Sequence, residues 1–100
     1  MTYSEFENRL LIGLVDATGA TQRGQCEARQ VAETVLPGAR EQWVGDAVQV
    51  YDQQGYLGPA ISRGLDGTIR LMISGEGRKA AERLRAQIAG TEQLRPKKES

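Results

Sequence analysis

The segment at residues 40–57 constrains the fold most, because it predicts a helix with a defined start, buried face and end. Its apolar residues recur at the spacing of one helical face. They are Val44, Ala47, Val48 and Tyr51. Pro37-Gly38 ends whatever helix precedes it. Gly55 predicts a left-handed cap at the far end, with the apolar residues 56–57 folding back onto the helix.

A β-hairpin is predicted immediately after this helix. Residues 60–65 and 68–74 have the pattern of two strands, and Asp66-Gly67 between them is the strongest short-range signal for a hairpin turn. In the second strand, alternate apolar residues are expected to pack on the helices. They are Ile69, Leu71 and Ile73. The first strand begins after Pro59, so we expect it at the edge of the sheet.

Three further helices are predicted from apolar spacing and capping signals. Ser4 and Glu7 match a capping box, so the first helix is expected at residues 4–18. The second is expected at about residues 25–36, and the last at residues 76–89. The apolar stripes of these two helices are Ala28, Val31, Ala32, Val35 and Leu36, and Ala80, Ala81, Leu84 and Ile88.

The domain is therefore expected to span residues 1–89. Residues 90–100 have almost nothing to bury, which predicts a disordered tail. The first seven residues are acidic and polar, unlike a signal peptide. The longest apolar stretch, at residues 10–15, is too short to span a bilayer. We expect a cytoplasmic protein with no membrane partner.

The charges bound the classes of partner. The 100-residue chain has 13 basic and 13 acidic residues, so its bulk charge does not argue for nucleic acid. Residues 1–57 carry four basic and eight acidic side chains, whereas residues 58–100 carry nine basic and five acidic ones. Any anion-binding surface is therefore expected in the second half.

Catalytic and metal chemistry have few candidates in this sequence. Cys26 is the single cysteine and there is no histidine, so neither an internal disulfide nor a thiol with its usual base is available. The carboxylates do not show metal-ligand spacing. Residues 74–79 join a strand to a helix, but they lack the spacing of a phosphate-binding loop. We predict a protein that is not an enzyme, with no cofactor and no small-molecule ligand.

Two short stretches resemble parts of winged helix-turn-helix domains. YDQQGYL at residues 51–57 looks like the end of their third helix and the step into the wing. LMISGEGR at residues 71–78 is similar to the strand-to-helix step of transcriptional regulators of the multiple-antibiotic-resistance type. Small phage and bacterial winged-helix proteins look just as similar. Over residues 4–89 the resemblance implies an α+β, mostly α fold: three helices, a two-stranded hairpin wing and a C-terminal helix.

The resemblance also implies where DNA would bind. In that family the third helix enters the major groove and the wing tip lies against the backbone or the minor groove. The corresponding positions here are Gln42, Gly45, Asp46, Gln49 and Gln53 on the helix and Arg63 and Arg70 beside the wing tip. The cations on which phosphate binding would then rely are Arg40, Arg63, Arg70 and Lys79. The third helix departs from the pattern because its outward face is polar but nearly uncharged, whereas DNA-binding surfaces contact phosphates mainly through cations.

Two functions stay open. The first is a DNA-binding regulatory module with a weakly basic wing, which acts on double-stranded DNA. The second is a protein-interaction module that uses the same scaffold as an adaptor, inhibitor or assembly subunit. Trp43, Val50 and Met72 would form its apolar patch if they were exposed together. Otherwise Trp43 is expected to cap the core between the third helix and the wing. The opposite charges of the two halves also allow a homodimer.

Overall fold

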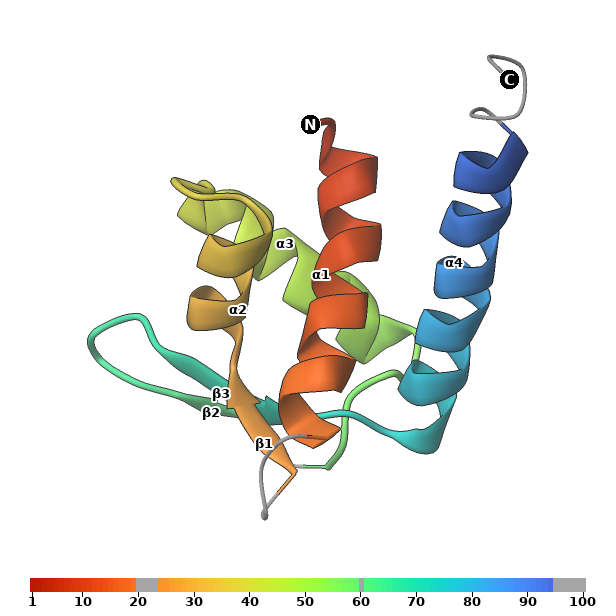
Figure 1. Cartoon of the computed structure of the whole chain (residues 1–100). Helices are drawn as coiled ribbons and strands as arrows, with labels where there is room; N and C mark the ends of the chain where they lie inside the picture. The colour runs from red at the N-terminus through yellow and green to blue at the C-terminus, as the bar shows by residue number, and fades with distance from the viewer. Residues whose placement is uncertain (20–23, 60, 95–100) are drawn as a thin grey trace.

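The computed structural model describes residues 1–19, 24–59 and 61–94, with the side chains of residues 91–94 left out. Over these ranges the chain forms four helices and a three-stranded antiparallel sheet (Figure 1). The elements are α1 (Tyr3–Gly19), β1 (Gln25–Glu27), α2 (Ala28–Val35), α3 (Glu41–Gln53), β2 (Ser62–Arg63), β3 (Ile69–Met72) and α4 (Gly75–Leu94). The prediction of an α+β fold that is mostly α is confirmed.

α1 lies at the centre of the helical layer and packs against α2 on one side and α4 on the other (Figure 1). Its first turn is capped by Thr2, whose hydroxyl accepts a hydrogen bond from the Glu5 N–H at 3.2 Å and donates to the Glu5 carboxylate at 3.4 Å. The predicted capping box of Ser4 and Glu7 is therefore wrong, because Ser4 already lies inside the helix.

β1 replaces the predicted start of the second helix. Gln25–Glu27 pairs antiparallel with β3, with Cys26 opposite Leu71. The Glu27 carboxylate accepts hydrogen bonds from the Arg29 N–H and, at 3.3 Å, from the Ile69 N–H. Glu27 is thus both the last residue of β1 and the N-cap of α2. The sheet has three strands rather than two, in the order β1-β3-β2.

The hairpin turns through three residues, 65–67, and not through the two predicted. Arg63 pairs with Ile69, the Gly64 N–H donates to the Thr68 carbonyl at 2.8 Å, and the Gly67 N–H donates to the Gly64 carbonyl at 3.1 Å. Gly67 has a positive φ of 88°, as a three-residue hairpin loop requires at its last position. β2 lies at the edge of the sheet, as expected.

α3 ends as its sequence predicts. Gly55 has a φ of 76°, its N–H donates to the Asp52 carbonyl at 3.1 Å, and the Tyr56 N–H donates to the Tyr51 carbonyl at 2.9 Å. This pair of bonds is a Schellman motif. The chain then makes an isolated bridge between Leu57 and Ile73.

The core lies between the helices and the inner face of the sheet. Its fully or almost fully buried members are Phe6, Leu10, Leu11, Leu14, Ala28, Ala32, Val44, Ala47, Val48, Tyr51, Leu57, Ile69, Leu71, Ile73, Ala80 and Ala81. The predicted stripe of α3 and the inward trio of β3 are confirmed. In the predicted stripes of α2 and α4, the residues at the edges are only half-buried: Val31, Val35, Leu36, Leu84 and Ile88.

α4 is longer than predicted. It runs antiparallel to α1 (Figure 1) and continues through residues 90–94, which were expected in the tail. Residues 95–100, the rest of that expected tail, lie outside the described residues. Among the helices of the described ranges, none has both the length and the apolar character needed to cross a membrane.

Candidate functional site

α3 exposes a polar stripe along the side that faces away from the core. Gln42, Asp46, Gln49 and Gln53 follow one another at helical spacing, and all are exposed. Gly45, predicted at the same surface, is half-buried. A glutamine amide can pair with the edge of an adenine, so the stripe offers hydrogen-bonding groups that suit base edges.

The N-terminal end of α3 favours an anion. Arg40 occupies the N-cap position and its side chain makes no capping bond. The N–H groups of the first turn therefore lack the side-chain acceptor that Ser, Thr, Asp or Asn would supply. Within the described ranges no ion pair engages the exposed Arg40 guanidinium. The helix dipole and the Arg40 guanidinium both attract an anion to this end of α3.

The hairpin loop is ordered by its own side chains. The Asp66 carboxylate accepts hydrogen bonds from the Thr68 N–H at 3.1 Å and from the Thr68 hydroxyl at 2.8 Å. The bond from the hydroxyl, then that from the N–H, lowers the pKa of Asp66 below its usual value. Leu65, at the tip, is fully exposed. The loop therefore presents a defined shape to solvent.

The register of the sheet places the two predicted wing arginines on opposite faces of the hairpin. Arg63 lies opposite Ile69, so its side chain is on the face that packs toward the helices. Arg70 lies opposite Ser62 in β2 and Glu27 in β1, on the outward face. Both arginines are exposed, and no ion pair holds either within the described part of the chain.

Arg29 joins the hairpin loop to the start of α3. Its Nη1 donates to the Asp66 carbonyl at 3.1 Å, and its Nη2 donates to the Glu41 carboxylate at 2.7 Å. The contact therefore places the start of α3, where Arg40 and Gln42 flank Glu41 in the chain, next to the hairpin loop. In the sequence, Arg29 lies outside the apolar stripe predicted for the second helix. No local signal could have revealed partners so distant in the chain.

An acidic cavity of about 260 Å³ lies between α2 and the start of α3. Glu27, Glu33 and Glu41 line it, with Arg29 as the cation among them. The carboxylates of Glu27 and Glu33 are already engaged with backbone N–H groups, and that of Glu41 is engaged with Arg29. The cavity is therefore a satisfied polar cluster beside the stripe.

Lys79 does not join this surface. It lies on the first part of α4, where its ammonium is 3.9 Å from the Glu76 carboxylate. Figure 1 shows α4 and the hairpin loop at opposite sides of the molecule. Of the predicted cations, Arg63 and Arg70 are neighbours in the paired strands β2 and β3, and Arg40 adjoins the start of α3, which Arg29 connects to the hairpin loop.

Trp43 packs against α1 and not against the wing, so the predicted location of this cap is wrong. Its ring is edge-on to Tyr3 and tilted against Phe6, with centroids 5.6 Å apart in each pair. Both partners belong to the first turns of α1, because the start of α3 lies beside that end of the helix.

The apolar residues of the alternative surface do not form one patch. Met72 is on the outward face of β3, opposite Gln25, which is beyond the C-terminal end of α1. Trp43 packs at the opposite end of α1. Val50 lies apart from both, in a groove formed by α1, α3 and α4.

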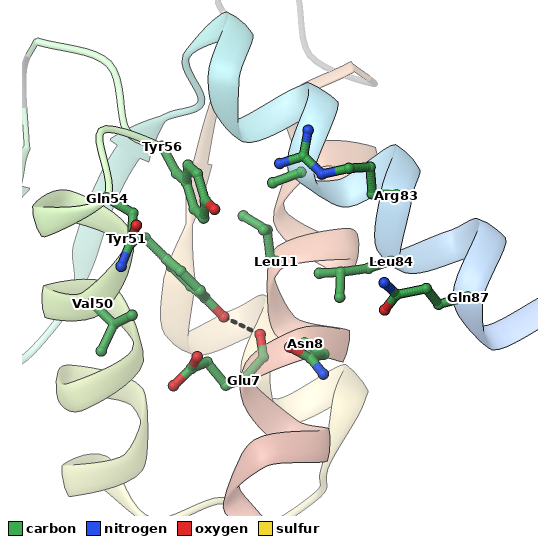
Figure 2. Close-up of a pocket in the computed structure, with 11 residues that line it drawn as sticks. Glu7, Asn8, Leu11, Val50, Tyr51, Gln54, Tyr56, Arg83, Leu84 and Gln87 are labelled. Atoms are coloured by element: carbon green, nitrogen blue, oxygen red, sulfur yellow. Dashed lines mark hydrogen bonds between the residues drawn. The ribbon is translucent and has the colours of Figure 1, made fainter.

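That groove has a volume of about 290 Å³ (Figure 2). Its apolar lining includes Leu11, Val50, Tyr56 and Leu84, and its polar lining includes Glu7, Asn8, Gln54, Arg83 and Gln87. At its floor the buried Tyr51 hydroxyl donates to the Glu7 carbonyl (Figure 2). Burial raises the pKa of Tyr51 far above its usual value. This phenol is therefore a structural hydrogen-bond donor.

The remaining reactive group is the Cys26 thiol. It is half-buried and lies 3.8 Å from the Leu14 carbonyl, to which it donates. Burial, together with the nearby Glu27 carboxylate, raises its pKa to about 11, which suppresses the nucleophilic thiolate. Within the described residues, no group of three or more Cys, Asp or Glu side chains could hold a metal ion.

Neither the protein-family models, nor the curated proteins, nor the solved structures with which the chain was compared gave a match.

Proposed function

We propose that the chain is a winged helix-turn-helix module that binds double-stranded DNA, with α3 as the recognition helix and the β2–β3 hairpin as the wing. The order of three helices, a hairpin and a last helix supports this assignment. So does the Schellman end of α3, which leads directly into the hairpin. β1 adds a strand to the wing without changing this order.

The observation that carries the proposal is the double contact of Arg29. It holds the start of α3 and the hairpin loop on one side, so the amide stripe and the wing can meet the same duplex. The stripe would supply base contacts through Gln42, Gln49 and Gln53. The uncapped N-terminus of α3 and Arg40 would supply a phosphate contact.

The wing arginines fit a hairpin that sits in a groove. A groove has a phosphate backbone on each side, so cations on opposite faces of the hairpin can each meet one strand. Arg63 and Arg70 have this arrangement. If Arg40, Arg63 and Arg70 each neutralise one phosphate, log K falls with log salt at a slope of about −2.7. Binding by a monomer is then weak, and a dimer on paired half-sites doubles the contacts.

Fluorescence anisotropy with a labelled duplex at a series of salt concentrations tests the proposal. Each single change of Arg40, Arg63 or Arg70 to Gln is expected to make the slope shallower by about 0.9. Arg83→Gln is the matched control, because Arg83 is an exposed arginine of the groove on α4. Binding that does not respond to salt, or that survives Arg63→Glu with Arg70→Glu unchanged, contradicts the proposal.

A second candidate function is protein interaction through the groove of Figure 2. The observation that favours it is the set of half-buried apolar side chains, Val50, Tyr56 and Leu84, beside charged and amide groups. Apolar surface with a polar rim is the composition of a protein interface. Co-purification from the native host with wild type and a Leu84→Asp variant tests this candidate. Loss of a protein partner only in the variant supports it, and recovery of DNA without a protein partner counts against it.

A further inference from the structure

We propose that Arg29 is the positioning residue that fixes the hairpin loop against the start of α3, so that the two elements form one rigid surface. The positioning itself is independent of DNA. Its consequence for DNA affinity rests on the proposed function and deepens it.

The planar guanidinium of Arg29 sets the distance between the hairpin loop and the start of α3. Nη1 and Nη2 belong to one planar group, and they donate to the Asp66 carbonyl and the Glu41 carboxylate at 3.1 and 2.7 Å. A planar fork with two occupied donors sets the separation of its two acceptors. The stem starts from α2 beside the buried Ala28, so the fork is anchored to the core.

Gly67 lies where the hairpin loop meets the Arg29 guanidinium. A Cβ at this position would lie 2.5 Å from the Arg29 Nη1, and the residue has a φ of 88°. The φ favours glycine, and the absence of a Cβ leaves the Arg29 guanidinium room to approach the loop in the position that it occupies. The loop is built to receive Arg29 closely.

The exposure of the partners indicates that the contact acts through geometry more than through stability. The Arg29 and Glu41 side chains are 37% and 79% exposed, so solvent screens their attraction. The same contact pairs the carboxylate of Glu41, the first residue of α3, with Arg29. Loss of Arg29 should therefore loosen the loop with little effect on unfolding of the whole domain.

Amide hydrogen exchange measured by NMR tests the positioning without DNA. In Arg29→Gln the amides of Gly64, Gly67 and Thr68 are expected to exchange about five- to tenfold faster. Arg29→Lys should restore less than half of the lost protection, because one ammonium cannot act as a fork. Arg9→Gln is the control, since Arg9 is exposed on α1 and makes no ion pair within the described ranges. Exchange unchanged in Arg29→Gln, or fully restored by lysine, overturns the proposal.

A second variant guards against an indirect effect of losing Arg29. Gly67→Asn adds a Cβ that meets Arg29 and also strains the backbone at a φ of 88°, although asparagine tolerates positive φ better than other side chains. The backbone strain is the same in both backgrounds, so the variant should accelerate loop exchange more in the wild-type background than when Arg29 is already glutamine. Equal effects in the two backgrounds would show that Arg29 does not hold the loop.

A double-mutant cycle on duplex binding tests the consequence for DNA. If Arg29 positions the wing, Arg63→Gln weakens binding severalfold in the wild-type background and has almost no further effect in Arg29→Gln. Effects that simply multiply would refute this coupling. If wild type binds no duplex at all, the proposed function fails, while the exchange experiments still decide the positioning role of Arg29.

Discussion

Replacing Gly77 with alanine should destabilise the domain, although alanine is the better helix former. Gly77 is buried in the first turn of α4, where the chain passes beneath the step from α3 to the sheet. A Cβ there would lie 2.3 Å from the Tyr56 carbonyl oxygen and 2.7 Å from the Ile73 Cγ2. The nearer of these atoms is backbone, so no rotamer change relieves the contact.

The magnitude follows from two opposing effects. Glycine to alanine in a helix contributes up to about 1 kcal/mol of stability. Overpacking a well-packed site costs about 1–3 kcal/mol, and a backbone clash belongs at the upper end. The net expectation is a loss of about 2 kcal/mol in the free energy of unfolding, or roughly 10 °C in Tm for a domain of this size.

Urea and thermal unfolding followed by far-UV circular dichroism measure the change. Gly90→Ala is the matched control, because Gly90 lies in the same helix and a Cβ there would meet nothing within 4 Å. It should be neutral or slightly stabilising. A Gly77→Ala protein as stable as Gly90→Ala would refute the close approach of the Tyr56 carbonyl to α4.

Two further predictions concern buried groups. Tyr51→Phe removes the bond from the hydroxyl to the Glu7 carbonyl and should lower the free energy of unfolding by about 1 kcal/mol, measured in urea. Tyr56→Phe should leave it unchanged, because the Tyr56 hydroxyl has no hydrogen-bond partner among the described residues. Burial raises the pKa of Cys26 from 9.0 to about 11, so the fold retains the thiol proton that the unfolded chain loses. That contribution is fully present below pH 9 and is lost as the pH rises toward 11. The decline in stability over this range should be shallower in Cys26→Ala, and an equally steep decline would show that the thiol is not desolvated.

Much of the helical structure could be predicted from local patterns. The spacing of Val44, Ala47, Val48 and Tyr51 fixes the buried face of α3, because only one side of a helix can hold all four. Gly55 marks the end of that helix, since a left-handed residue favours glycine. The inward trio of β3 follows from strand alternation in the same way.

Errors arose where neighbouring residues permit more than one structure. Asp66-Gly67 suits a two-residue turn, but it also suits the last part of a three-residue loop, because both need a positive φ at glycine. The pairing of β2 with β3 selects the three-residue loop. This register places Arg63 and Arg70 on opposite faces of the hairpin. Gln25–Glu27 has no strand pattern of its own, and the free edge of β3 makes it a strand.

One part of the candidate surface could likewise be predicted from the sequence, and another part depends on the tertiary structure. From the sequence alone, the polar stripe of Gln42, Gln49 and Gln53 is determined, because it is the complement of an apolar stripe on the same helix. The contact of Arg29 with Asp66 and Glu41 depends on tertiary structure, because packing of α2 against α3 and the sheet brings together residues far apart in the chain. Local periodicity determines which side of each helix is polar. Only the packed fold decides which polar sides meet the same partner.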